Sequence, residues 1–435
     1  MEISKLYTYY LQNPIICTDT RSIKPGCLFF ALKGDNFNGN KFALQAIELG
    51  AALAIIDEDI SDQNSRLFKV DDVLIALQEL AKYHRQQILI PIIGITGSNG
   101  KTTCKELIKA VLSTHFKTFA TIGNLNNHIG VPLSVLSILP DTEVAIIEMG
   151  ANHQQEIAFL CKICQPKIGL ITNVGKAHLE GFGGFEGVKK GKKELYDFLG
   201  LTNGITFINR PDDNLERMSS EIPTKFYYGT NDDNYICGNS FLNNNFVGVN
   251  WWVGSESEQK FEIQSNLTGL YNFDNIMAAI AIGYYFTLTP NLIKQGIENY
   301  IPENNRSQLA ISGNLKIIKD YYNANPSSMR AAIKNLKTMP AEYKIAILGD
   351  MFELGDESET EHQSIILLAI DSEFDQLIFV GERFYEFKRF QNFSINFFEK
   401  TEDLAKKLNN LIPKKASILI KGSRGIKLEK IAELL

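Results

Sequence analysis

A short segment near residue 100 has the residue types and spacing of a phosphate-binding loop. An apolar run at 92–95 is followed by Thr-Gly-Ser-Asn-Gly-Lys-Thr-Thr at 96–103. The glycines let backbone N–H groups crowd around a polyphosphate, the lysine can neutralise its outer phosphates, and a threonine hydroxyl can ligate Mg²⁺. The residues expected to hold the phosphates are Gly97, Ser98, Asn99, Gly100, Lys101, Thr102 and Thr103.

The residues after this loop have the apolar spacing of a helix. Five apolar side chains fall at i, i+3, i+4, i+7 and i+8: Cys104, Leu107, Ile108, Val111 and Leu112. The general P-loop pattern requires a glycine six residues before the lysine, where this chain has Ile95. A chance glycine-rich turn is the alternative interpretation, but strand, loop and amphipathic helix occur in the required order and favour the phosphate loop.

Composition narrows the class of protein. The chain has 435 residues, 44% of them hydrophobic, which is enough for two to four domains that each bury a core. Its net charge of −6 argues against a nucleic-acid partner. Without a signal sequence or a long apolar run, we expect a cytoplasmic monomer without a membrane span. Six cysteines are too few for a disulfide framework, and Cys161 and Cys164 are interpreted as buried apolar residues rather than a zinc or redox pair.

Alternating apolar runs and helical patterns predict three α/β domains. Residues 1–85 form a small first domain, with strands at 27–32 and 51–56. Residues 86–305 form the nucleotide domain, whose runs at 88–95, 144–147, 168–171 and 205–208 predict a parallel sheet. Residues 306–435 form a third, Rossmann-like domain. Residues 232–262 have poor periodicity and are expected to contain hairpins, and a helix is expected at 270–282.

Polar residues at the predicted strand ends and turns are the candidate ligands. Glu148 ends a strand beside the phosphate-loop strand, where a carboxylate is more often a metal ligand than a helix cap or an ion-pair partner. Asn272 and Asn275 share one face of a helix, so both side-chain amides can contact the same edge of a ligand. The turns at 18–21 and 33–39 suit a diphosphate or sugar nucleotide, with solvated loops as the alternative. They contain Thr20, Arg21, Lys33 and Asn38.

The order of these motifs resembles the Mur ligase family over essentially the whole chain. The loop Thr-Gly-Ser-Asn-Gly-Lys-Thr-Thr is the family's ATP-loop variant. Five further segments resemble the branch that joins D-alanyl-D-alanine to a UDP-N-acetylmuramoyl-tripeptide: Gly-Asn-Leu-Asn-Asn-His-Ile-Gly-Val-Pro at 123–132, Glu-Met-Gly-Ala-Asn at 148–152, His-Leu-Glu-Gly-Phe-Gly at 178–183, Asn-Asn-Arg-Ser-Gln at 304–308 and Tyr-Asn-Ala-Asn-Pro-Ser-Ser at 322–328.

This resemblance implies an ATP-dependent ligase of cytoplasmic peptidoglycan-precursor synthesis that acts through an acyl phosphate. It implies that the three domains bind the UDP-sugar, ATP with Mg²⁺, and the incoming dipeptide. By resemblance, Thr102 and Glu148 hold one metal, His178 and a carbamylated Lys192 hold a second, and Asn275 lies near adenine. By resemblance, residues of the third domain and its linker meet the nucleotide or substrates: Arg306, Asp320, Asn323, Asn325, Lys421, Ser423 and Arg424.

Several alternatives stay open at this point. Gly-Lys-Lys-Glu at 191–194 offers two lysines, Lys192 and Lys193, for one role. His178 could be an ordinary loop histidine and Arg306 a solvated linker charge. Another Mur-family ligase, a polyglutamate-adding relative or a non-catalytic regulator are competing functions. A polyglutamate-adding enzyme would lack the first domain, and a regulator would be expected to have lost Lys101, Glu148 or His178. The third residue of the tripeptide, diaminopimelate or lysine, is left open.

Overall fold

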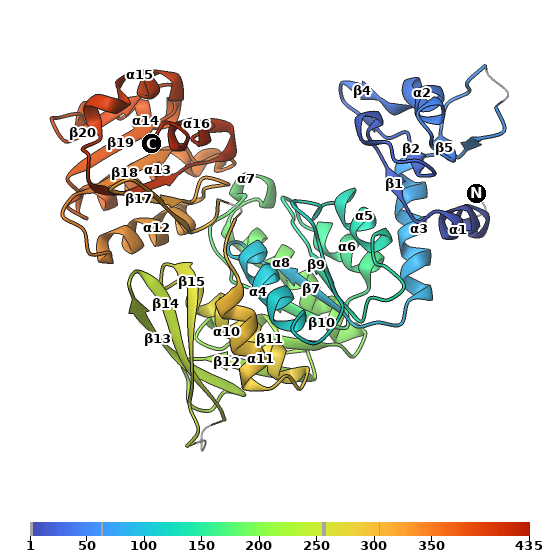
Figure 1. The fold of residues 1–435 in the computed structure, drawn as a ribbon, viewed down its shortest axis with the longest axis horizontal. Helices are drawn as coiled ribbons and strands as arrows, with labels where there is room; N and C mark the ends of the chain where they lie inside the picture. Colours follow the sequence, from blue (N-terminus) through green and yellow to red (C-terminus); the bar gives the residue numbers. More distant parts are fainter. Residues whose placement is uncertain (1–2, 62–63, 255–257, 304) are drawn as a thin grey trace.

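The computed structural model describes residues 3–61, 64–254, 258–303 and 305–435, which form three α/β units in chain order (Figure 1). Asn304 of the fourth motif segment and residues 255–257 of the predicted hairpin region lie outside the described residues. The first unit and the third unit lie on opposite sides of the central one in Figure 1. None of the helices in the described ranges is long and apolar enough to cross a membrane.

The first unit is built on a four-stranded parallel sheet. Its strand order is β1 (Ile16–Cys17), β2 (Leu28–Phe30), β5 (Leu53–Ile56) and β6 (Leu67–Lys69). Helices α1 (Ile3–Gln12) and α2 (Ala43–Glu48) belong to the same unit. Both strands that the sequence predicted for this region are confirmed, with slightly shorter bounds.

A single helix, α3 (Val73–Gln87), joins the first unit to the second. It packs against α5 (Gly130–Leu136) and α6 (Glu156–Cys164) of the central unit. The Arg85 guanidinium donates to the Cys164 carbonyl at 2.9 Å, and the Tyr10 hydroxyl donates to the Leu136 carbonyl at 2.8 Å. The first unit is therefore fixed to the central unit by packing and by buried hydrogen bonds.

The central sheet has nine strands in the order β15-β14-β13-β12-β11-β10-β7-β9-β8. In this order, each strand from β13 to β8 is parallel to the next. β14 is antiparallel to both of its neighbours, β13 and β15. Their bounds are β7 (Ile92–Thr96), β8 (Thr118–Ala120), β9 (Val144–Glu148), β10 (Ile168–Ile171), β11 (Ile205–Asn209), β12 (Thr224–Gly229), β13 (Ile236–Asn243), β14 (Phe246–Val253) and β15 (Phe261–Thr268). The main helices are α4 (Lys101–Leu112), α8 (Phe185–Leu201), α10 (Asn272–Tyr285) and α11 (Pro290–Asn299).

Two predicted bounds in this unit were wrong. The strand expected from residue 88 begins at Ile92, because Pro91 has no N–H for the ladder and Leu89 is 95% exposed in the connection after α3. The helix expected from residue 270 begins at Asn272. The sequence analysis also missed β8 and β12, of which β8 is a three-residue edge strand.

The third unit is a six-stranded sheet in the order β16-β17-β21-β18-β19-β20, with only β16 antiparallel. Its elements are β16 (Gln308–Ser312), β17 (Leu315–Lys319), α12 (Pro326–Thr338), β18 (Lys344–Gly349), α13 (Ser358–Ile370), β19 (Gln376–Val380), β20 (Ile395–Phe398), α15 (Thr401–Leu411) and β21 (Ala416–Lys421). The predicted α/β class with parallel sheets is confirmed. The domain limits at residues 85 and 305 stay a prediction, and the first of them falls within α3.

The hairpin expected in residues 232–262 is present as β13 and β14. Asn243 pairs with Phe246, which leaves Asn244 and Asn245 as a two-residue loop with φ of 51° and 73°. Two positive φ values are the signature of a type I′ turn, which matches the twist of the flanking strands. Asparagine tolerates this left-handed conformation far better than β-branched residues do.

This turn gives a test of the backbone geometry. Asn244→Val should lower the free energy of unfolding by about 1–2 kcal/mol, because a β-branched residue resists positive φ. Both tryptophans of the chain, Trp251 and Trp252, lie in β14, so tryptophan fluorescence during urea unfolding reports on this hairpin. Asn243→Val, at an exposed strand position one residue earlier, is the control and should be neutral. Equal loss in both variants would contradict the turn assignment.

Candidate functional site

The phosphate loop lies between β7 and α4, where its two glycines have conformations that other residues resist. Gly97 has φ of 144°, and a Cβ there would lie 2.0 Å from the Thr172 hydroxyl oxygen. Gly100 caps α4 with φ of 79°, and a Cβ there would lie 2.6 Å from Asn275 Oδ1. Both positions therefore require glycine for backbone conformation and for close approach of neighbouring chains.

Lys101 occupies the first position of α4 and is half-buried, rather than standing on a solvated loop. Its ammonium donates to the carbonyls of Gly97 at 2.6 Å and Ser98 at 3.3 Å. Burial, opposed by Glu148 and assisted by Arg306, lowers the pKa of Lys101 to about 8. The lysine is thus held by the loop that it would use to bind phosphate.

A cavity of about 970 Å³ lies between the second and third units, beside the phosphate loop. The ends of several parallel strands meet there, as expected for ligand sites of such sheets. It brings together most of the residues predicted for the nucleotide and for the third-domain site. The predicted residues that line it are Ser98, Asn99, Gly100, Lys101, Thr102, Thr103, Glu148, His178, Asn272, Asn275, Arg306, Asp320, Asn323, Asn325 and Lys421.

Some predicted residues do not line this cavity. Gly97, Lys192, Ser423 and Arg424 lie near it or behind its walls, and the four residues of the first unit belong to a different sheet. The two expected cations of the first unit already have carboxylate partners. Arg21 pairs with Asp19 at 2.5 Å, and Lys33 pairs with Asp57 at 2.9 Å and Glu58 at 3.1 Å.

The two remaining predicted residues of the first unit are polar groups near these pairs. The Asn38 amide donates to both carboxylate oxygens of Glu58 at 3.0 and 3.1 Å, and Thr20 lies in a half-buried turn directly before Arg21. An anionic ligand at this surface would therefore compete with Asp57 and Glu58 for Lys33. The sequence did not indicate these pairings, because the partners of Lys33 lie more than twenty residues further along the chain.

Glu148 lies at the end of β9 and is buried, with its two carboxylate oxygens in different surroundings. Oε1 accepts hydrogen bonds from the Thr102 hydroxyl at 3.2 Å and the Asn126 amide at 3.0 Å. Oε2 is buried and has no hydrogen-bond partner among the described residues. A buried carboxylate oxygen with free lone pairs beside a hydroxyl fits Mg²⁺, which takes one or two protein oxygens and completes its shell with water and phosphate.

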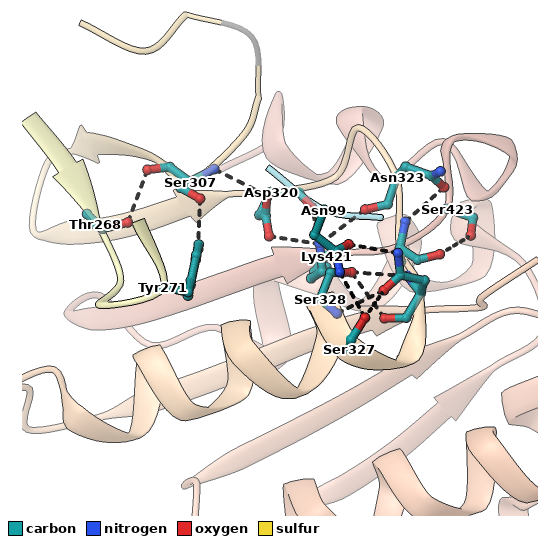
Figure 2. A network of polar contacts seen from close by, with 12 residues as sticks. Asn99, Thr268, Tyr271, Ser307, Asp320, Asn323, Ser327, Ser328, Lys421 and Ser423 are labelled. Carbon is teal, nitrogen blue, oxygen red and sulfur yellow. Dashed lines mark hydrogen bonds and ion pairs between the residues drawn. The ribbon is translucent and has the colours of Figure 1, made fainter. Parts of the chain in front are cut away.

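Hydrogen bonds from the phosphate loop cross the boundary to the third unit (Figure 2). The Asn99 side chain accepts from the Asn325 amide at 2.8 Å and donates to the Ser327 hydroxyl at 2.8 Å. Its backbone is held from the other side by Asn173, which bonds both the Asn99 N–H and its carbonyl at 3.0 Å. Asn325 also caps α12. Asn99 therefore links the nucleotide loop to a helix start of the third unit.

A second chain of contacts positions the linker between the units. Asp320 accepts from the Lys421 ammonium at 2.8 Å and from the Ser307 backbone at 3.2 Å, and Ser307 also meets Tyr271 and Thr268 (Figure 2). These bonds hold the linker on which Arg306 lies.

Aromatic stacking then places the guanidinium of that linker arginine. The Arg306 guanidinium lies 3.9 Å from the centre of the Tyr322 ring, and the Arg424 guanidinium lies 5.8 Å from the same ring on the edge of the third unit. Two guanidinium groups beside one aromatic ring suit an anionic ligand.

His178 engages the third unit in this arrangement. It precedes the short helix α7 (Leu179–Phe182) with φ of 53°, and its Nδ1 contacts the Glu353 carboxylate, which lowers the pKa of Glu353. Nearby, Lys176 pairs with Glu361 at 2.6 Å and with Glu357 at 3.2 Å. These ion pairs add to the Asn99 contact in holding the two units together.

The two candidate lysines of α8 have different environments. Lys192 is 1% exposed, with its ammonium 5.1 Å from the centre of the Phe182 ring. Burial, with a contribution from Lys101, lowers the pKa of Lys192 to about 7. Lys193 is partly exposed and pairs with Asp197 one turn further along the helix.

Several site residues were missed in the sequence. Asn126 holds Glu148, Asn173 holds Asn99, and Asp274 lines the cavity beside the predicted Asn275. Thr172 and Asn173 end a predicted strand, which marks the position as a ligand edge, but the sequence analysis assigned Asn173 no role. Asn126 belongs to one of the segments that resemble the family branch, but only the fold reveals its contact with Glu148.

The charge state of Asp274 provides a test of this site. Burial raises the pKa of Asp274 from its ordinary value of about 4 to about 6, because the buried site favours the neutral acid. This contribution to stability is present below about pH 4 and is lost as pH rises through about 6. Asp274→Asn lacks the titration, so the variant should gain about 1–3 kcal/mol relative to wild type between pH 4 and pH 7. A pH-independent difference in the free energy of unfolding would contradict the burial of this carboxyl.

Family models and relatives match the chain over nearly its whole length. The models described as Mur ligase family, catalytic domain; Mur ligase middle domain; and Mur ligase, glutamate ligase domain match residues 14–87, 95–283 and 305–424. The UDP-N-acetylmuramoyl-tripeptide–D-alanyl-D-alanine ligase of Bacillus subtilis is 35% identical over 96% of this chain and 92% of its own. The Escherichia coli ligase of the same name is 35% identical over 97% and 93%.

Two solved structures also align with nearly the whole chain. A crystal structure of MurF from Acinetobacter baumannii aligns with a TM-score of 0.87 at 31% identity, covering 96% of this chain and 92% of the other. The Thermotoga maritima MurF ligase, in complex with ADP, aligns with a TM-score of 0.85 at 25% identity, covering 97% and 96%.

Proposed function

The chain belongs to the Mur ligase family, and on this premise we propose that it joins D-alanyl-D-alanine to a UDP-N-acetylmuramoyl-tripeptide with conversion of ATP to ADP and phosphate, in peptidoglycan precursor synthesis. The observation that carries the proposal is the cavity between the second and third units. It places the phosphate loop and Glu148 opposite Asp320, Asn325 and Lys421. The six free, buried cysteines support a reducing compartment such as the cytoplasm.

The reaction requires two anions to meet. The terminal carboxylate of the tripeptide attacks the γ-phosphorus of ATP, and ADP leaves with the electrons of the broken P–O bond. The amine of D-alanyl-D-alanine then attacks the resulting acyl phosphate, an amide forms, and inorganic phosphate leaves with the acyl C–O electrons. Phosphoryl transfer of this kind depends on positioning and on neutralisation of charge rather than on covalent chemistry by the protein.

Residues of the phosphate loop supply the positive charge and the metal ligands. Lys101 would contact the outer phosphates, and the backbone between Gly97 and Thr103 would surround them. The Thr102 hydroxyl and the Glu148 carboxylate would hold Mg²⁺. When bound, the metal neutralises phosphate charge and orients the transferred group. Asn272 and Asn275, on the first turn of α10, would contact the nucleotide at its other end.

The third unit would orient the incoming dipeptide. Asp320 and Lys421 form a nearly buried pair that fixes the end of β17, and Asn323 and Asn325 point polar groups of the same turn toward the cavity. Arg306, stacked on Tyr322, would stabilise negative charge that develops on the transferred phosphate. Ser423 and Arg424 continue this turn. The tripeptide would extend from the cavity toward the first unit, whose loops with Thr20, Arg21, Lys33 and Asn38 would hold its uridine diphosphate.

Lys192, as a carbamate, would hold a second Mg²⁺ together with His178. A carbamate forms from the neutral amine and CO₂, and a pKa near 7 leaves much of the Lys192 amine neutral at neutral pH. The modification replaces a cation by two anionic oxygens, the ligand type that Mg²⁺ prefers. Lys193 is instead partly exposed and pairs with Asp197.

The function is tested by phosphate release from ATP. Release should require both D-alanyl-D-alanine and a UDP-N-acetylmuramoyl-tripeptide, and tripeptides ending in diaminopimelate or lysine should be compared directly. Release with a single amino acid in place of the dipeptide would identify the chain as a different ligase of the family.

Removal of the loop lysine should stop turnover without unfolding the protein. Lys101→Ala should lower the rate of ADP formation about 10²–10³-fold, or about 2.7–4 kcal/mol, by analogy with loss of one preorganised donor to a transition state. The melting temperature should stay close to that of wild type, because Lys101 packs little apolar surface. Lys109→Ala, at an exposed position two turns later on α4, should keep full activity. An unchanged rate in Lys101→Ala would remove the phosphate-loop assignment.

The two lysines of α8 should respond differently to replacement. Lys192→Ala should be inactive and partly rescued by acetate, whose carboxylate can stand in for the missing oxygens. Lys193→Ala should keep most activity, because it loses only an exposed ion pair. Initial rates of phosphate release with and without acetate measure both effects. Loss of activity in Lys193→Ala alone would reverse the assignment.

A further inference from the structure

A fully buried lysine lies behind the phosphate loop, on the second turn of α4. Lys105 is 0% exposed, and its ammonium donates to the Thr121 carbonyl at 2.6 Å. It also pairs with Glu106 Oε1 at 2.9 Å, and the Glu106 side chain is 29% exposed. Burying an ammonium is costly unless nearby groups compensate its charge. The mechanism above does not use this lysine.

The second anion that faces Lys105 is Glu148. Lys105 Nζ lies 3.9 Å from Glu148 Oε2, the oxygen that has no hydrogen-bond partner. This separation is too long for a hydrogen bond but well within the range of a strong electrostatic interaction. Thr102 and Asn126 occupy only the other oxygen, Oε1. The lysine therefore compensates the charge of the carboxylate and leaves the lone pairs of Oε2 open.

Thr121 connects the two residues a second time. Its carbonyl accepts from Lys105, and its hydroxyl accepts from the Glu148 backbone N–H at 3.0 Å. Any movement of the lysine would thus be transmitted to the strand end that carries Glu148. The geometry is that of a positioning group behind a ligand, rather than of a group that touches substrate.

We propose that Lys105 is a positioning residue that holds Glu148 ready for Mg²⁺ and sets how tightly the nucleotide-bound protein holds that metal. The proposal rests on the proposed function, because it takes Glu148 as the metal ligand of the ATP site. The ammonium and the metal compete electrostatically for one carboxylate. Before the metal binds, the Lys105 ammonium compensates the charge of the buried Glu148 carboxylate. Once the metal is bound, the ammonium weakens its binding enough for the metal to exchange with each turnover.

Two substitutions should shift metal binding in opposite directions. Lys105→Met keeps the length of the side chain and removes the charge, so Mg²⁺ becomes the main compensation for Glu148 and should bind more tightly. Glu106→Gln removes the other anion beside Lys105. The positive charge of Lys105 then acts more strongly on Glu148, and Mg²⁺ should bind more weakly. A purely structural lysine would instead give losses in both variants.

The experiment measures ADP binding by calorimetry with Mg²⁺ and with EDTA in place of Mg²⁺. The ratio of the two dissociation constants isolates the metal contribution from general effects on the nucleotide site. The factor by which Mg²⁺ tightens ADP binding should rise about tenfold in Lys105→Met, given the strength of a charge interaction at this separation. It should fall about threefold in Glu106→Gln, where partial exposure screens the charge. Lys109→Met, exposed on the same helix, should match wild type.

The outcomes separate this inference from the proposed function. An unchanged ratio, or a fall in both variants, would overturn the role of Lys105 while wild type still binds ADP in a Mg²⁺-dependent manner. Wild type that binds ADP equally well with EDTA would instead count against Glu148 as the metal ligand. If Lys105→Met does not fold, Lys105→Gln takes its place with the same expected rise, because its amide can still donate to the Thr121 carbonyl while the charge is removed.

Discussion

The cavity of this protein depends on the hydrogen bonds of one amide, the side chain of Asn99. Its oxygen and nitrogen bond to Asn325 and Ser327 of the third unit, while its backbone is held by the end of β10. Room for this contact comes from Gly175, where a Cβ would lie 2.7 Å from the Ser327 hydroxyl. Because an amide offers a donor and an acceptor in fixed geometry, the contact sets both the distance and the orientation of the third unit. The loop that would hold the phosphates is therefore itself part of the interface between the second and third units.

Clustered positive charge is the second feature that organises the site. Burial lowers the pKa of Lys101, Arg306 lowers it as well, and Glu148 compensates only in part. The Arg306 guanidinium lies over the ring of Tyr322. Such an arrangement is unfavourable for the protein alone and favourable once a polyanion is present. The negative charge of a bound nucleotide would therefore strengthen the association of the second and third units.

The sequence predicted what depends on local spacing. The strand at 168–171 and the helix that follows the glycine-rich loop are set by periodicity and by glycine positions, and they were found within a few residues. Contacts between distant segments were not predictable in this way. The pairing of His178 with Glu353 and of Lys33 with Asp57 depends on how whole units are arranged. Asn126 lies in a segment that resembles the family branch, but nothing in the sequence pairs it with Glu148, and β8 is too short to give a clear strand signal.

The rigidity of α3 has a consequence for substrate length. This helix is packed on α5 and α6 and anchored by Arg85 and Tyr10, so the first unit cannot swing independently of the phosphate loop. The linker near Arg306, in contrast, is held mainly by hydrogen bonds of Ser307 with Asp320, Tyr271 and Thr268. A substrate anchored by its nucleotide end in the first unit would reach the phosphate loop only with a peptide of the right extension. The fixed position of α3 would then select substrates by the number of residues that their peptide already carries.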